Sequence, residues 1–198
     1  VETPCKLRKF EIRLKEAFRY YCFLPRRVSD PVLQDMKKQV AELLRQGVIQ
    51  ECHDSPWAFP IVMARRPGSD KLRLCIDYVL QNQQTVPLPF TIPETKEQLD
   101  KLAGKKFFCS LDCSSFFHQF EIREEDRDFT AFVVPWGQKF RWARVPFGLR
   151  NSPAHTQKEF QQLLAANGLM DVIPYYDDVC FGADNADDLC EKFEKLLR

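Results

Sequence analysis

Two adjacent carboxylates, Asp177 and Asp178, lie within a run of otherwise aromatic, β-branched or small residues that spans positions 173–182. Apolar residues on both sides of an acidic pair predict two short strands joined by a turn. Adjacent carboxylates repel each other, so a turn that holds both favours a nearby cation, and hard divalent cations prefer carboxylate oxygens. The alternative is a solvated surface turn, which is a common place for an Asp-Asp pair.

A third carboxylate, Asp112, lies where the apolar run at 107–111 ends. A lone Asp at this place is commonly a helix N-cap. Together with Asp177 and Asp178 it would be a third ligand from a neighbouring strand. Three carboxylates at one edge of a sheet can hold two magnesium ions about 3.5–4 Å apart, the arrangement used for in-line phosphoryl transfer. One ion would activate an attacking 3′-hydroxyl, and the other would neutralise charge on a triphosphate and its leaving pyrophosphate.

A basic loop joins two predicted strands between positions 65 and 73. It carries Arg65, Arg66, Lys71 and Arg73 within a few residues. Guanidinium groups bind phosphate oxygens through paired hydrogen bonds, so the loop is a candidate triphosphate site. The alternative is a solvated basic turn.

These residues must be positioned by a mixed set of helices and strands. Apolar spacing and end signals predict helices at 31–46, 94–102, 151–166 and 186–197, and strands at 48–49, 58–64, 72–78, 107–111 and on both sides of residues 135–137. The strand at 107–111 is apolar on both faces, which predicts a central position in its sheet. A proline-rich connector covers 87–93. The pattern is α+β, without a Gly-rich dinucleotide motif or a P-loop.

Composition limits the classes of protein. The chain has 198 residues, 44% of them hydrophobic and 29% charged, which is typical of one large or two small globular domains. The net charge of +1 does not by itself indicate a nucleic-acid-binding protein. Eight scattered cysteines without a CxxC pair argue against a zinc site and predict reduced thiols in an intracellular, non-secreted protein. We find no apolar run long enough to span a membrane and no signal peptide.

Six short motifs in register resemble the reverse transcriptase domain of gypsy-type long-terminal-repeat retrotransposons, and the resemblance runs from about residue 25 to residue 198. They are Ser55-Pro56-Trp57, Leu72-Arg73-Leu74-Cys75-Ile76-Asp77-Tyr78, Leu111-Asp112 with Phe117-His118-Gln119, Thr130-Ala131-Phe132, Val145-Pro146-Phe147-Gly148-Leu149-Arg150-Asn151-Ser152-Pro153-Ala154, and Tyr175-Tyr176-Asp177-Asp178. The chain departs from the family pattern at Val79, Gln81, Phe116 and His155, where Arg, Leu, Gly and a small or apolar residue are usual.

The resemblance implies an α+β fold of right-hand polymerase fingers and palm, with the palm an antiparallel sheet backed by helices. It implies an N-terminal extension at 1–24, fingers at 25–86 and 120–151, and palm at 87–119 and 152–198. We expect this chain to stop before the primer grip and to lack the thumb, as a piece of a longer polyprotein that would carry the thumb and an RNase H domain.

The resemblance also implies roles for individual residues. Two magnesium ions, or manganese in their place, would be held by Asp112, Asp177 and Asp178 with help from the Cys113 carbonyl. The nucleotide would contact Arg66 and Arg73 through its phosphates, the backbone amides of Ser115 and Phe116, and a pocket of Phe117, Phe147 and Gly148. Phe117 would lie beneath the sugar and exclude a 2′-hydroxyl, although a buried Phe is core packing in most proteins. Template and primer would contact Arg65, Lys71, Tyr175 and Tyr176.

The expected activity is RNA-directed DNA polymerisation from dNTPs on a primed RNA or DNA template. A different class of function is a domesticated, non-catalytic descendant that serves as a structural or nucleic-acid-binding subunit. The near-neutral charge and Phe116 favour that alternative, whereas three intact, mutually repelling carboxylates argue against it. An RNA-templated RNA polymerase is a third reading, and the bulk of Phe117 argues against it.

Overall fold

The computed structural model describes residues 7–65, 68, 71–91 and 95–197. Two compact units divide the chain, and each is built from two separate segments. Unit 1 comprises Val1–Pro87 and Phe117–Ser152, and unit 2 comprises Leu88–Phe116 and Pro153–Arg198. The chain therefore passes from one unit to the other three times. The names fingers and palm for these units stay predictions.

Unit 1 is built around a five-stranded sheet in the order β1-β6-β5-β2-β3. Its elements are α1 (Asp30–Arg45), β1 (Ile49–Glu51), β2 (Phe59–Arg65), β3 (Leu72–Ile76), α2 (Val79–Gln84), the 3-10 helix η2 (Glu124–Thr130), β5 (Phe132–Val133) and β6 (Lys139–Trp142). The predicted hairpin of β2 and β3 is confirmed, because the two strands pair antiparallel. A parallel pairing of β2 with β5 joins the hairpin to the rest of the sheet.

Helix α1 has the ends that its sequence predicts. Ser29 precedes it in an extended conformation, and Pro31 lies in the first turn, where its missing N–H costs no helical hydrogen bond. Gly47 follows the helix with a φ of 64°, the left-handed conformation that glycine adopts most easily. Met36 and Val40, four positions apart on one face, are its buried residues.

The described part of the N-terminal segment, residues 7–24, is packed into unit 1. Phe10 is buried and forms a β-bridge with Ile122, while Cys22 forms another with Ala58. The backbone N–H of Ile12 donates to the carboxylate of Asp126, which is itself buried. These contacts attach the segment to the rest of unit 1 near both of its ends.

Gln81, one of the departures from the family pattern, is fully buried in α2. Neither atom of its side-chain amide has a hydrogen-bond partner among the described residues. A buried amide without partners costs on the order of 1–3 kcal/mol. The Leu that is usual at this position would avoid that cost.

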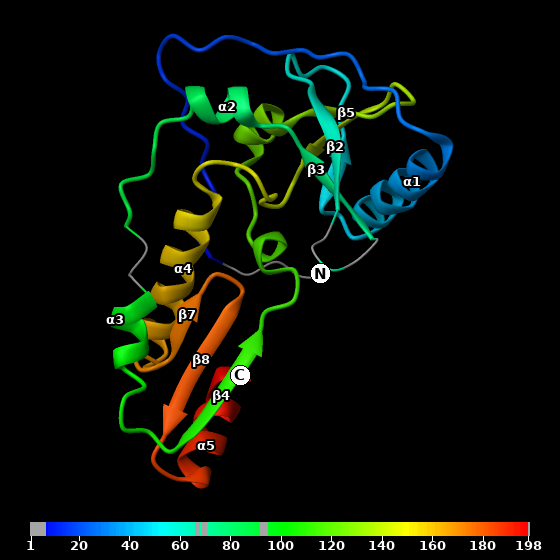
Figure 1. Cartoon of the computed structure of the whole chain (residues 1–198). Coiled ribbons are helices and arrows are strands. Elements are labelled where there is room, and N and C mark those ends of the chain that lie inside the picture. The colour runs from blue at the N-terminus through cyan, green and yellow to red at the C-terminus, as the bar shows by residue number, and fades with distance from the viewer. Residues whose placement is uncertain (1–6, 66–67, 69–70, 92–94, 198) are drawn as a thin grey trace. The chain divides into compact units, whose positions relative to one another are not determined.

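Unit 2 contains a three-stranded antiparallel sheet in the order β4-β8-β7, whose strands lie side by side in Figure 1. Its elements are α3 (Thr95–Asp100), β4 (Phe107–Asp112), α4 (Ser152–Ala166), β7 (Ile173–Tyr175), β8 (Asp178–Ala183) and α5 (Ala186–Leu197). Helix α5 has the bounds that the sequence predicted. A further 3-10 turn, η1 (Phe116–Gln119), lies where the chain leaves unit 2.

One face of this sheet carries the core of unit 2. Val179 and Phe181 of β8 are fully buried on it, together with Leu164 of α4. Leu111 of β4 and Phe193 of α5 pack against the same cluster. Side chains alternate between the two faces along a strand. Asp112, next to Leu111, and Asp178, next to Val179, therefore lie on the face opposite the core.

The predicted central position of the strand at 107–111 is wrong. In the described sheet β8 is central, and β4 pairs only with β8. The apolar residues that suggested a doubly covered strand include Phe107 and Phe108, which are 42% and 58% exposed. Consecutive apolar residues that stay partly exposed at the start of an edge strand give the same sequence pattern as a strand buried on both sides.

Within the described residues, no helix combines the length and apolar character needed to cross a membrane. The seven cysteines that the structure describes all have free thiols.

Candidate active site

The acidic pair lies at the tip of the β7–β8 hairpin. Tyr175 and Asp178 are paired across the hairpin, so the turn itself consists of Tyr176 and Asp177. Tyr176 has a φ of 54°, the left-handed conformation that a bulky residue rarely adopts. The rings of Tyr175 and Tyr176 meet edge to face, with centroids 4.8 Å apart. The predicted hairpin with an acidic turn is confirmed.

Asp112 comes to the same end of the sheet. It is the register partner of Asp178 in the antiparallel pair of β4 and β8. Directly opposite residues in such a pair project their side chains from the same face. The backbone N–H of Cys113 donates to the carbonyl oxygen of Asp177, with N and O 2.6 Å apart. The backbones of all three acidic residues are therefore held together at one sheet end.

The three carboxylates are exposed, and none takes part in an ion pair among the described residues. The described part of the chain holds no group of three or more His, Cys, Asp or Glu side chains placed to bind a metal ion. The donor set nevertheless suits a hard divalent cation, since it offers three exposed carboxylates from one end of the sheet. A metal site formed by Asp112, Asp177 and Asp178 stays a prediction.

Gln157 of α4, which the sequence patterns did not identify, forms two hydrogen bonds with the backbone of the hairpin. Its Nε2 donates to the carbonyl oxygen of Pro174 at 2.6 Å, and its Oε1 accepts from the backbone N–H of Tyr176 at 2.9 Å. The signal available in the sequence was a polar residue three positions before Phe160, on the face of the helix that packs against the core.

The loop that follows Asp112 is partly buried and partly strained. Cys113 packs against the core of unit 2. Ser115 has a φ of 51°, in the left-handed region. Phe116 is buried, and its ring lies 5.3 Å from that of Phe160. The bulky side chain that replaces the usual glycine is thus accommodated in the core.

The predicted nucleotide pocket residues Phe117, Phe147 and Gly148 belong to unit 1. Phe117 is 7% exposed and its ring centroid is 4.6 Å from that of Phe147, which is 55% exposed. Gly148 has a φ of 93° and lies against the backbone of Ile76. Both readings of Phe117, core residue and sugar contact, are consistent with a buried ring beside an exposed one.

His118 follows directly and is half-buried between two rings. Its centroid lies 5.6 Å from that of Trp142 and 6.2 Å from that of Phe147. Burial lowers the pKa of its imidazole to about 4, since desolvation disfavours the charged form. The ring is therefore neutral at neutral pH.

The basic loop residues that the structure describes are exposed on the β2–β3 hairpin. Arg73 is paired with Ala64, so Arg65, one position further along β2, projects from the opposite face of the hairpin. Lys71 is exposed just before β3. Arg66, the other predicted phosphate ligand, lies outside the described residues.

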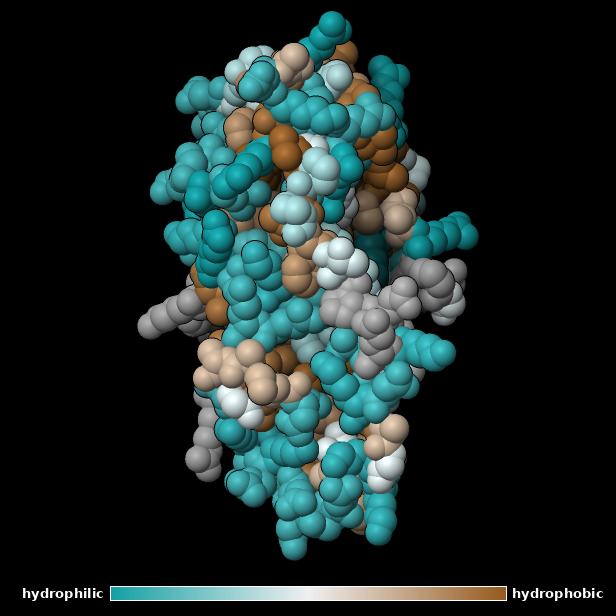
Figure 2. Space-filling model, turned by 90° about the vertical axis from the view of Figure 1, so that its left-hand side faces the viewer, coloured by the Kyte–Doolittle hydropathy of each residue, from teal (hydrophilic) through white to brown (hydrophobic). Residues whose placement is uncertain are grey.

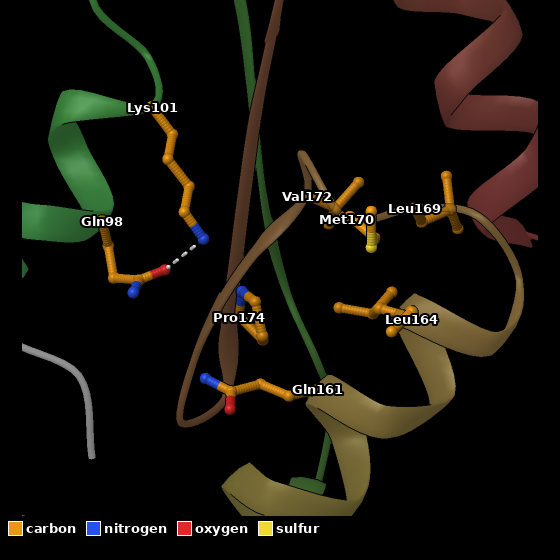
Figure 3. Close-up of a pocket in the computed structure, with 9 residues that line it drawn as sticks. Gln98, Lys101, Gln161, Leu164, Leu169, Met170, Val172 and Pro174 are labelled. Atoms are coloured by element: carbon orange, nitrogen blue, oxygen red, sulfur yellow. Dashed lines mark hydrogen bonds between the residues drawn. The ribbon is translucent and has the colours of Figure 1, made fainter. Parts of the chain in front are cut away.

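Unit 2 also has a pocket of about 330 Å³ between α3, α4 and the end of β7 (Figure 3). It is lined mainly by apolar side chains, including Leu164, Leu169 and Met170, with Gln98 and Lys101 hydrogen-bonded to each other at one side. None of the predicted site residues lines it.

The face of the molecule in Figure 2 is mostly hydrophilic, with apolar side chains gathered in a few places.

Comparison with known proteins identifies the family. The family model for reverse transcriptase (RNA-dependent DNA polymerase) matches residues 36–198. This chain belongs to the reverse transcriptase family, and the predicted resemblance to retrotransposon enzymes of the gypsy kind is confirmed.

Three relatives illustrate the similarity. The chain is 36% identical over 149 residues to the retrovirus-related Pol polyprotein from transposon 297 of Drosophila melanogaster, covering 73% of this chain and 14% of that protein. It is 31% identical over 168 residues to the Pol polyprotein from transposon gypsy of the same organism, covering 82% and 16%. It is 30% identical over 183 residues to the enzymatic polyprotein of cauliflower mosaic virus (strain NY8153), covering 91% and 26%. The chain spans 14–26% of the length of these polyproteins.

Proposed function

We propose that this chain contains the fingers and palm residues of an RNA-directed DNA polymerase, with unit 1 as fingers and unit 2 as palm. The reaction would transfer a nucleotide from a dNTP to the 3′-hydroxyl of a primer on an RNA or DNA template. The observation that carries the proposal is the register pairing of Asp112 with Asp178 beside the turn that holds Asp177, in a member of the reverse transcriptase family.

In this proposal Asp112, Asp177 and Asp178 would hold two magnesium ions, or manganese, with the Cys113 carbonyl assisting. When bound, the ions supply the activation of the 3′-hydroxyl and the neutralisation of charge on the phosphates. The residues of the chain position the carboxylates that would bind these ions. The shared register of β4 and β8 fixes Asp112 against Asp178, and the Cys113 N–H fixes the backbone of Asp177.

The residues of unit 1 would bind and select the nucleotide. Arg73, on the face of the hairpin opposite Arg65, has the charge and exposure to contact phosphate oxygens, and Arg66 would join it. Phe117, supported by the ring of Phe147, would lie beneath the sugar. Arg65 and Lys71 of unit 1 would contact the template and primer, as would Tyr175 and Tyr176 of unit 2. The backbone amides of Ser115 and Phe116, which also belong to unit 2, would approach the phosphates.

The second candidate function is a non-catalytic structural or nucleic-acid-binding subunit. The observation that favours it is the net charge of +1, which gives little general attraction for a polyanion. Such a subunit would bind nucleic acid or a protein partner without polymerising.

Primer extension by the natural protein that contains these residues separates the two functions. Asp112→Asn and Asp177→Asn should each abolish extension, because each removes a charged metal ligand without changing side-chain size. The matched control is Asp187→Asn, which changes an exposed carboxylate of α5 and should leave extension unchanged. Extension that survives in both site variants, or is absent from the unaltered protein, would overturn the catalytic proposal.

A further inference from the structure

Gln157 is almost completely buried, with 1% of its surface exposed, yet it carries a polar amide. Both atoms of that amide are used, and both bonds go to the same strand end. Nε2 donates to the Pro174 carbonyl and Oε1 accepts from the Tyr176 N–H. A buried amide with both its nitrogen and its oxygen hydrogen-bonded in this way has a fixed orientation.

The two bonded groups are those that the outer edge of β7 presents. β7 is an edge strand, so its outward backbone groups lack a partner strand. Pro174 has no N–H, which leaves its carbonyl as the only outward group of that residue. The next outward group along the chain is the N–H of Tyr176, in the turn. The Gln157 side chain therefore hydrogen-bonds to the open edge of β7 and to the backbone of the turn that follows it.

The turn has a backbone conformation that requires stabilising hydrogen bonds. Tyr176 adopts a left-handed φ of 54°, which costs a non-glycine residue on the order of 1–2 kcal/mol. Asp177 is tied on its other side by the hydrogen bond from Cys113. The acidic turn is thus held between α4 and the loop after β4, and these two ties fix the backbone from which the Asp177 carboxylate projects.

The carboxamide of glutamine is the group that fits this position. A Glu carboxylate offers an acceptor without a donor, and Met offers neither. Asn has both groups, but its side chain is one methylene shorter and cannot span both bonds from the same backbone position.

We propose that Gln157 is a positioning residue for the Tyr176-Asp177 turn and thereby sets the affinity of the acidic site for divalent cations. The inference rests on the proposed function, because it assumes that Asp112, Asp177 and Asp178 bind those cations. Removal of groups that orient metal ligands typically costs 10- to 100-fold in metal affinity or activity. We expect Gln157→Met to weaken cation binding by about tenfold or more.

Titration of the full chain with Mn²⁺, followed by the electron paramagnetic resonance signal of free Mn²⁺, measures that affinity. The variants are Gln157→Met, Asp177→Asn and the matched control Gln162→Met, which places the same substitution on an exposed position of α4. We expect Asp177→Asn to lose the site, Gln157→Met to weaken it about tenfold, and Gln162→Met to bind within twofold of the unaltered chain.

A second measurement separates positioning from simple stabilisation. Amide hydrogen exchange should become at least tenfold faster at Tyr176 in Gln157→Met, while amides in the middle of β8 keep their protection. If Gln157→Met does not fold, Gln157→Asn replaces it and should show the same two effects. A variant that folds, lowers the melting temperature and binds Mn²⁺ like the control would overturn the positioning role.

The outcomes also distinguish this inference from the proposed function. If the unaltered chain does not bind Mn²⁺, or Asp177→Asn binds it equally well, the proposed function fails. If Asp177→Asn loses the site while Gln157→Met keeps it, the proposed function stands and the positioning role is wrong.

Discussion

At the scale of single residues, side chains of the same type have different surroundings in the structure. Asp112 and Asp178 face each other in register and are exposed, whereas Asp126 is buried and accepts a backbone hydrogen bond. Phe117 is buried beside an exposed partner ring, whereas Phe108 is itself exposed. Predictions about these side chains can therefore be tested one residue at a time.

Phe117→Val tests the proposed selection against ribonucleotides. Loss of the flat ring should make room for a 2′-oxygen, so the ratio of ribonucleotide to deoxyribonucleotide incorporation should rise about tenfold or more. The burial of Phe117 also predicts a stability loss on the order of 3 kcal/mol. The control is Phe132→Val, a fully buried ring of β5, which should lose stability without changing the ratio. An unchanged ratio in Phe117→Val would mean that the ring serves only in packing.

His118 predicts a pH dependence for the stability of unit 1. Its folded pKa of about 4 lies below the ordinary value of 6.5, so the unfolded chain binds more protons between these pH values. The contribution of the neutral imidazole to stability should be fully present above pH 6.5 and be lost between pH 6.5 and 4, by on the order of 3 kcal/mol. Urea unfolding followed by tryptophan fluorescence measures this, because all three tryptophans lie in unit 1.

The matched histidine variants identify the group responsible for that loss. His118→Gln should flatten the curve between pH 6.5 and 4. His53→Gln should leave it unchanged, since the His53 side chain is 82% exposed. The assignment would be contradicted if the two variants gave the same pH dependence.

At the scale of elements, the parts that the sequence predicts are those with local signals. The start and end of α1 follow from Pro31 and Gly47, and the acidic hairpin follows from two apolar runs around Asp177 and Asp178. The neighbours of a strand are set by residues far away in the chain. The sequence therefore placed β4 at the centre of its sheet, although β8 occupies that position.

The residues of the candidate site also differ in whether local sequence signals identify them. Asp112, Asp177 and Asp178 could be named from their positions at strand ends, and the structure brings their backbones together. The role of Gln157 depends on α4 packing beside β7, which no pattern within α4 specifies. The facing of Phe117 toward Phe147 likewise depends on contacts between segments that are distant in the sequence.

The edge position of β4 predicts different costs for two phenylalanines of one sheet. Phe108→Ala should lower the free energy of unfolding by less than about 1 kcal/mol, because the ring is already exposed. Phe181→Ala on β8 should cost about 3–5 kcal/mol, because that ring is fully buried in the core. Denaturant unfolding followed by far-ultraviolet circular dichroism measures both. Equal costs would mean that another layer covers Phe108.

At the scale of the whole molecule, each unit is assembled from two distant segments. Asp112 comes from the first segment of unit 2, and Asp177 and Asp178 come from the second. The acidic site therefore exists only when both segments have paired through β4 and β8. Not every basic side chain is available to contact a phosphate backbone, since Arg144 is buried and Arg141 forms an ion pair with Asp128.

The exposed basic side chains predict salt-dependent binding of a primer–template despite the small net charge of +1. Exposed basic side chains that could contact phosphates include Lys37, Lys38, Arg65 and Lys106. Four such contacts would give a slope of about −4 for the logarithm of the binding constant against the logarithm of salt concentration. Fluorescence anisotropy of a labelled duplex measures the slope. Arg65→Gln should reduce it by about 1, whereas Lys195→Gln on α5 should not change it. A flat response would favour the non-catalytic alternative.

Asp112, Asp177 and Asp178 are proposed to form one divalent cation site at the end of the β4–β8 pair. Crystals of this chain grown with Mn²⁺, measured at a wavelength where manganese scatters anomalously, test it directly. We expect an anomalous peak within bonding distance of the Asp112 carboxylate and of at least one of the Asp177 and Asp178 carboxylates. An Asp112 carboxylate more than about 10 Å from both others, with manganese bound elsewhere or not at all, would contradict it.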